Sequence, residues 1–175
     1  MNIKINIWKR VSYKSGDLFL TRRSERRYAE RGRSWFEDLM GYYRYSPNAG
    51  WSHTEYIADN FKAIDFYKKT SEVADEIFAS SVVSVKTTTA TNVNEWLETA
   101  VIKNNIQNIR DAAGEGLDKG ITWNRKTIRY HYPEMHIYMP KDNLMPALKQ
   151  EWLNKLTSEY PTVKFELYTL DEFVK

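Results

Sequence analysis

Hydrophobic and polar residues alternate, or β-branched residues cluster, along several stretches of the chain, and both patterns favour β-strands. Ile3, Ile5 and Ile7 alternate with polar residues, and Val163, Phe165 and Leu167 do the same near the C-terminus. Two hairpins are also predicted, one with its turn at Asp59-Asn60 and one with its turn at Pro133-Glu134. We expect strands over residues 3–7, 17–20, 53–58, 62–67, 82–89, 127–132, 135–140 and 162–168, with a turn at Ser15-Gly16 between the first two.

Apolar residues recur at helical spacing in the remaining segments. Ser71 is the expected N-cap of one helix, and Asn92 with Glu95 has the spacing of a capping box at the start of another. Helices are predicted over residues 22–40, as one helix or as two short helices broken near Gly32, and over residues 71–80, 92–111 and 144–156. No repeat, low-complexity tract or linker interrupts the pattern. We therefore predict one α+β domain over residues 1–175, mainly an antiparallel sheet built from hairpins, with three to four packed helices.

Composition narrows the class of protein without identifying it. A chain of 175 residues that is 42% hydrophobic and 28% charged is typical of one soluble globular domain. The absence of cysteine excludes disulfides, thiolate metal ligands and a cysteine nucleophile. The N-terminal residues lack the apolar core of a secretory signal, and no window is apolar enough for a membrane span. The expected location is the cytoplasm.

Positive charge is concentrated in one segment, although the net charge of the chain is only +3. Arg22, Arg23, Arg26 and Arg27 have the spacing i, i+1, i+4 and i+5, so on a helix they form one basic ridge. Arg33 and Arg44 are expected to extend this ridge. Such a ridge neutralises phosphates and releases counterions, which gives binding without sequence readout.

Aromatic residues follow the arginines closely. Trp35 and Tyr43 are the aromatic residues that we assign to the binding surface, because aromatic rings stack on bases. A solvated helix face and an acidic protein partner are the alternatives to nucleic acid. Glu25 and Glu30 are spaced for pairing with arginines on the same helix, which weakens the positive field. The leading hypothesis is a non-catalytic binding protein for nucleic acid or an acidic protein, with a composition suited to a phage or mobile-element product.

His53 is the candidate for catalysis. It lies two residues before Glu55 on a predicted strand, so both side chains would share one face. A neutral imidazole acts as a general base near neutral pH, and a neighbouring carboxylate can set its tautomer. The alternative to the binding hypothesis is therefore a histidine-dependent hydrolase of RNA or of acyl and amide groups, with His53 as base and Glu55 as its partner. A strand histidine with a purely structural role is the competing interpretation.

Two motifs carry a family resemblance. "GDLFLTR" is followed by "WSHTEYIADNFKAIDFY", and residues 15–67 resemble the opening of circularly permuted papain-fold proteins of the NlpC/P60 superfamily. In that family a Gly-Asp-Leu strand precedes a Ser-His strand, and the histidine activates a cysteine placed later, near the start of a helix. The resemblance implies that Gly16 to Leu18 form the first motif and that His53 is the base. The position expected for the nucleophile holds Val93, so cysteine chemistry is absent.

His131 and His136 are the other two histidines, and the hairpin predicted at Pro133-Glu134 would bring them together. With Glu134 they could bind a metal or cleave RNA, but no HxH, HExxH or acidic cluster accompanies them. The glycines of residues 114–120 lack the context of a phosphate-binding loop. We expect neither a metal nor a cofactor. A third functional hypothesis is a virion or assembly component, which predicts homo-oligomers formed through the aromatic surface.

Overall fold

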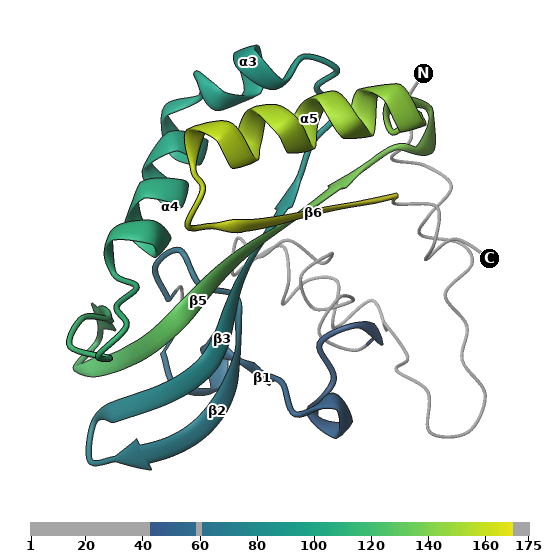
Figure 1. Ribbon diagram of the computed structural model, residues 1–175. Coiled ribbons are helices and arrows are strands. Elements are labelled where there is room, and N and C mark those ends of the chain that lie inside the picture. The colour runs from purple at the N-terminus through teal and green to yellow at the C-terminus, as the bar shows by residue number, and fades with distance from the viewer. Residues whose placement is uncertain (1–42, 59–60, 170–175) are drawn as a thin grey trace, which may run out of the picture.

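A six-stranded mixed sheet with helices on one side makes up the described part of the chain (Figure 1). The computed structural model describes residues 43–58 and 61–169. The strands run in the order β1-β2-β3-β5-β4, and β6 also pairs with β5. The strands are β1 (Ser52–His53), β2 (Phe66–Val73), β3 (Glu76–Thr87), β4 (Ile121–Trp123), β5 (Lys126–Met139) and β6 (Lys164–Thr169). This confirms the predicted α+β class.

The sheet combines antiparallel and parallel pairings. β1 with β2, β2 with β3 and β4 with β5 are antiparallel, whereas β5 runs parallel to both β3 and β6. Parallel neighbours require crossover connections. Here α3 (Val93–Leu97) and α4 (Ala100–Asp111) lie between β3 and β4, and α5 (Pro146–Glu159) lies between β5 and β6. Helical crossovers therefore position the centre of the sheet, which hairpins alone could not do.

Two predicted elements near the sheet centre were wrong. Residues 71–80, predicted as a helix, form the end of β2 and the start of β3, with Ala74 at positive φ in the turn between them. Residues 127–140, predicted as a hairpin turning at Pro133-Glu134, form one continuous strand, β5. Proline is tolerated there because the β4 and β6 pairings both stop short of it.

The hairpin predicted over residues 53–67 is only partly present. Ser52 and His53 pair with Tyr67 and Phe66, but residues 54–56 form a short 3-10 helix rather than a strand. The strand predicted at 82–89 lies in β3, the helix predicted from residue 92 corresponds to α3 and α4, and the C-terminal helix and strand correspond to α5 and β6. Asn92 caps α3 through its side-chain oxygen, which accepts from the backbone N–H groups of Asn94 and Glu95. The strands predicted at 3–7 and 17–20 and the helix predicted at 22–40 lie outside the described residues.

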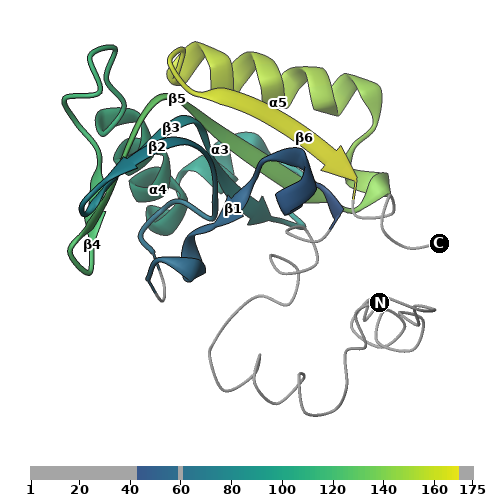
Figure 2. The same ribbon diagram turned by 90° about the horizontal axis from the view of Figure 1, so that it is seen from below.

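Each face of the sheet has its own core. The larger core lies between the sheet and the helices, where Trp152 of α5 and Ile106 of α4 are fully buried. The smaller core lies on the opposite face of the sheet. The segment that leads into β1 runs on that side of the sheet (Figure 2). The smaller core consists of Tyr45, Phe66, Val83, Val85 and Tyr138, with Trp51 and Tyr168 packed against it.

One irregularity in β3 and β5 determines which side chains reach the smaller core. Ile128 and Tyr130 face the helices, but farther along β5 Met135 and Ile137 do so. The backbone hydrogen bonds show the same change. The N–H of Thr127 donates to the C=O of Asp75, just before β3, and the C=O of Tyr138 accepts from the N–H of Thr88, just after β3. Both groups therefore point to the β3 side of β5. In a regular strand, two residues eleven positions apart point their backbone groups to opposite sides. The alternation of side chains along β5 therefore shifts by one residue between Thr127 and Tyr138. The shift places Glu134, His136 and Tyr138 together on the face opposite the helices.

Candidate functional site

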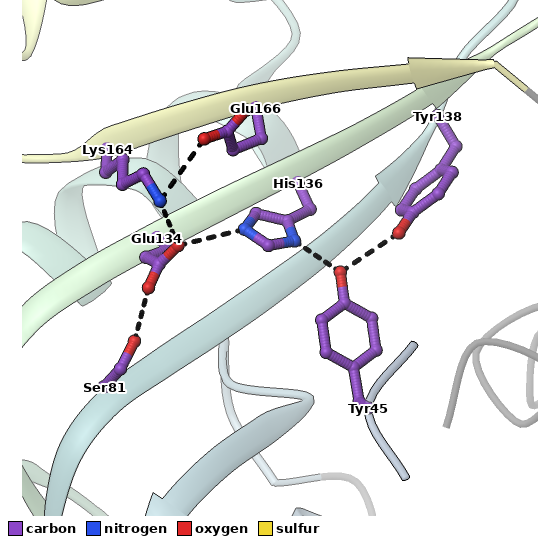
Figure 3. A network of polar contacts seen from close by, with 7 residues as sticks. All are labelled: Tyr45, Ser81, Glu134, His136, Tyr138, Lys164 and Glu166. Atoms are coloured by element: carbon purple, nitrogen blue, oxygen red, sulfur yellow. Dashed lines mark hydrogen bonds and ion pairs between the residues drawn. The ribbon is translucent and has the colours of Figure 1, made fainter. Parts of the chain in front are cut away.

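A chain of polar side chains crosses the face of the sheet opposite the helices (Figure 3). At its centre, one oxygen of Glu134 contacts His136 Nε2 and Lys164 Nζ, both at 3.1 Å. The other oxygen accepts a hydrogen bond of 2.6 Å from Ser81. Beyond His136, Nδ1 is bonded to the hydroxyl of Tyr45. The side chains come from β3, β5, β6 and the segment before β1, so only the folded sheet assembles them.

The directions of these hydrogen bonds follow from the carboxylate. An ionised Glu134 can only accept, so His136 Nε2 carries a proton and donates it. In the neutral imidazole Nδ1 is then an acceptor, and the Tyr45 hydroxyl must donate to it. Burial, together with the nearby Tyr138 hydroxyl, raises the pKa of Tyr45, so this proton is retained. Tyr138, at 3.1 Å, is left to donate to the oxygen of Tyr45.

The charge of Glu134 is held in place by its neighbours. Burial by itself would raise the pKa of this carboxyl, but hydrogen bonds from His136, Ser81 and Lys164 outweigh burial and lower the pKa to about 2. The hydrogen bond to Glu134 in turn raises the pKa of Lys164, which also contacts Glu166 at 3.2 Å. A carboxylate with so low a pKa does not take a proton from a serine at neutral pH. At neutral pH the network therefore holds an ionised carboxylate between three hydrogen-bond donors.

Tyr45 anchors the segment that follows the N-terminal region. Its side chain is only 2% exposed, stacks on Phe66 with ring centroids 4.4 Å apart, and meets the edge of Trp51. The neighbouring Arg44 lies over the ring of Tyr168 at 3.5 Å from its centroid. A hydrogen-bonded hydroxyl within an apolar pocket fixes both the depth and the register at which this segment meets the sheet.

Only two of the predicted binding residues lie within the described part of the chain. Arg44 is placed against the aromatic rings of β5 and β6, and Tyr43 is 44% exposed. The other predicted binding residues lie outside the described residues: Arg22, Arg23, Arg26, Arg27, Arg33 and Trp35.

His53 and Glu55 do come together, as their spacing suggested. The side-chain atoms His53 Nδ1 and Glu55 Oε2 are 3.6 Å apart. However, His53 Nδ1 accepts the backbone N–H of Glu55 and so caps the short helix over residues 54–56. The ring also packs edge-on against Phe66 at 4.7 Å, and Nε2 is buried. This arrangement favours a structural role, and catalysis by His53 stays a prediction.

Replacing His53 with alanine distinguishes the two roles. The change removes the cap and the packing against Phe66, so we expect a loss of about 1–2 kcal/mol in the free energy of unfolding. Urea denaturation measures this loss, and Tyr56→Ala is the control because Tyr56 is exposed and follows in the same short helix. A variant as stable as the parent protein would contradict the structural role and support the catalytic one.

The remaining histidines do not form the pair that was predicted. His131 and His136 lie on the same strand, β5, and not on two strands facing each other across a turn. No cluster of three metal-ligating side chains occurs within residues 43–58 and 61–169. No helix in that same part of the chain is long and apolar enough to span a membrane.

A groove opens at the Glu134 end of the polar network. It has a volume of about 840 Å³ and lies between the end of α4, the middle of β5 and the start of β6. Ser81, Glu134 and Lys164 line it, together with His131 and Tyr132. Tyr132 is 70% exposed, and the centroid of its ring lies 5.9 Å from the centroid of the His131 ring.

The sequence does contain a pattern that indicates the polar network, but the predicted hairpin over residues 127–140 obscured it. "EMHIY" in β5 and "KFELY" in β6 each place polar or aromatic residues at every second position. In the parallel pairing, Glu134 lies beside Lys164, His136 beside Glu166, and Tyr138 beside Tyr168. Interpreting residues 127–140 as two strands hid this match, because a turn at Pro133-Glu134 breaks the alternation.

Comparisons with known proteins place the chain in no family. Neither a protein-family model nor a curated protein matches it. Among solved structures, it is similar to a chain of the CdiA-CT/CdiI toxin and immunity complex from Yersinia pseudotuberculosis. The two chains are 15% identical with a TM-score of 0.48, and the likeness covers 78% of this chain and 99% of that chain. A likeness at this level carries no argument about function.

Proposed function

We propose that this chain is a non-catalytic binding protein whose arginine-rich segment engages a polyanionic partner, with nucleic acid as the first candidate. The distribution of charge carries the proposal. Residues 1–42 hold ten of the 26 Lys and Arg but only five of the 23 Asp and Glu. The described residues, 43–58 and 61–169, hold 15 of each. Attraction to a polyanion therefore originates in the first 42 residues, and the folded sheet is neutral.

Tyr45 attaches the described chain that follows the arginine-rich segment to the sheet. The arginine-rich segment ends shortly before Tyr45, whose hydroxyl is bonded to His136 and Tyr138 beneath the sheet. The polar side chains of this site are occupied by one another, and the carboxylate at its centre has a pKa of about 2. These features support a scaffold that positions a charged segment more than they support a catalytic centre.

Salt dependence tests the proposal. In the parent protein we expect log Kd for single-stranded oligonucleotides to rise steeply with log salt. Replacing Arg22, Arg23, Arg26 and Arg27 with glutamine should reduce that slope by about 0.7 for each phosphate that the variant no longer neutralises. Fluorescence anisotropy over a salt series measures the slope, and a parallel series with polyglutamate tests an acidic protein partner.

A matched variant controls for net charge. Glutamine at four exposed lysines of the described part removes the same charge, and we expect it to leave the slope nearly unchanged. The four positions are Lys62, Lys103, Lys119 and Lys141. An equal decrease in slope in the two variants, or no binding of either polyanion by the parent protein, would refute the proposal.

A further inference from the structure

The groove beside Tyr132 is built on an incomplete edge of the sheet. β4 pairs with β5 only as far as Ile128, and the β6 pairing starts at Glu134. Between them, the described residues supply no strand on that side of β5. The C=O of Tyr130 accepts instead from the N–H of Gly114, in the turn after α4. The groove of about 840 Å³ occupies this interval.

The backbone of the groove floor argues against an added strand of a partner protein. An extended peptide needs alternating free N–H and C=O groups along the edge that receives it. Pro133 has no N–H to offer, the C=O of Tyr130 is already bonded, and the alternation of the strand shifts between these two residues. An occupant must therefore be recognised by side chains.

The charges of the groove are balanced, which argues against a phosphate as the occupant. Lys164 is paired with Glu134 at 3.1 Å, and Arg110 is paired with Asp111 at 2.7 Å. Glu115 adds a negative charge to the lining. A phosphate entering here would meet cations whose charge a carboxylate already offsets, whereas the binding of a neutral group depends on neither charge.

An exposed aromatic ring in a charge-balanced hollow matches a nucleobase. Every base has a flat π-face that stacks on tyrosine, and such stacking needs no charge on the base. Thr162, which also lines the groove, brings a hydroxyl group for hydrogen bonds to base edges.

We propose that this groove binds an unpaired base of single-stranded nucleic acid, with Tyr132 as the stacking platform. This inference rests on the proposed function and assigns that function a second surface. The arginine-rich segment supplies attraction that salt weakens, and the groove supplies stacking that salt leaves largely intact. The two surfaces divide recognition between phosphate and base.

Substitution of Tyr132 tests the groove directly. Tyr132→Ala should weaken binding of a 12-nucleotide single strand by about 5- to 150-fold, corresponding to the stacking of one base. The salt slope should stay that of the parent protein, and Tyr132→Phe should retain the affinity within about threefold because the ring remains. Duplex DNA of the same length should bind the alanine variant and the parent equally. Because Tyr132 is 70% exposed, thermal unfolding of both variants should match that of the parent.

The outcomes separate this inference from the proposed function. Unchanged affinity in Tyr132→Ala, or an equal decrease in affinity for duplex and single strand, overturns the groove as a base site and leaves the arginine segment standing. Binding of polyglutamate but of no oligonucleotide also overturns the groove and retains an acidic protein as partner. No salt-dependent binding by the parent protein overturns both.

Discussion

Replacing Tyr45 with alanine is expected to lower the free energy of unfolding by about 3–5 kcal/mol, the range for removing a large buried aromatic side chain. The ring is nearly fully buried and stacks on Phe66. Its removal leaves a cavity in the smaller core and also deprives His136 Nδ1 of its donor. Urea denaturation monitored by circular dichroism measures the effect.

Two further variants divide this cost into parts. Tyr45→Phe keeps the ring and removes the hydroxyl, so stability should fall by about 1–3 kcal/mol through the unsatisfied His136 and Tyr138. Tyr43→Ala alters an exposed side chain two positions earlier and should cost less than about 1 kcal/mol. If Tyr45→Ala costs no more than Tyr43→Ala, then Tyr45 does not anchor this segment.

Replacing Glu134 with glutamine is expected to lower the free energy of unfolding by about 2–4 kcal/mol at pH 7, because three donors lose their common charged acceptor. An amide offers one oxygen where the carboxylate offers two, and its NH₂ group cannot accept from Ser81, His136 or Lys164. Glu166→Gln is the matched control. It removes the other carboxylate that contacts Lys164, but that ion pair is more exposed and should contribute only about 0–1 kcal/mol.

The lowered pKa of Glu134 also predicts how the free energy of unfolding depends on pH. The folded pKa of about 2 lies below the ordinary value of 4.5. The unfolded chain therefore binds a proton first as the pH falls. Stability from Glu134 is fully present above pH 4.5 and is lost as the pH falls through 2. Discounted for partial solvent exposure, this loss is on the order of 1–2 kcal/mol, and Glu134→Gln should lack it. If the free energy of unfolding falls by the same amount with decreasing pH in Glu134→Gln and in the parent protein, the assignment to Glu134 is contradicted.

The two stability predictions also bear on binding. Tyr45→Phe leaves every arginine in place. The slope of log Kd against log salt should therefore stay close to that of the parent protein. Glu134 and Lys164 line the groove as well as the network. Variants there therefore test folding first, and the exposed Tyr132 remains the cleaner probe of base stacking.

Short-range patterns sufficed for the elements that lie within one stretch of chain. The capping side chain of Asn92, the amphipathic helix α5 and the alternation of β6 all depend on neighbours a few residues away. Local rules therefore predicted them and, with them, the α+β class. The same rules misassigned residues 71–80, where the pairing of β2 with β3 overrides a weak helical pattern.

The candidate site required interactions between distant residues. Tyr45 and His136 are separated by 91 residues, and Ser81 and Glu134 by 53. The parallel register of β5 with β6 places Glu134 beside Lys164, and the one-residue shift in β5 determines which face both occupy. Alternation along a strand specifies that side chains share a face, but not which face or which neighbours. By itself, then, the amino-acid order determined the local elements and the concentration of arginines, whereas strand pairing across the sheet decided which polar groups meet.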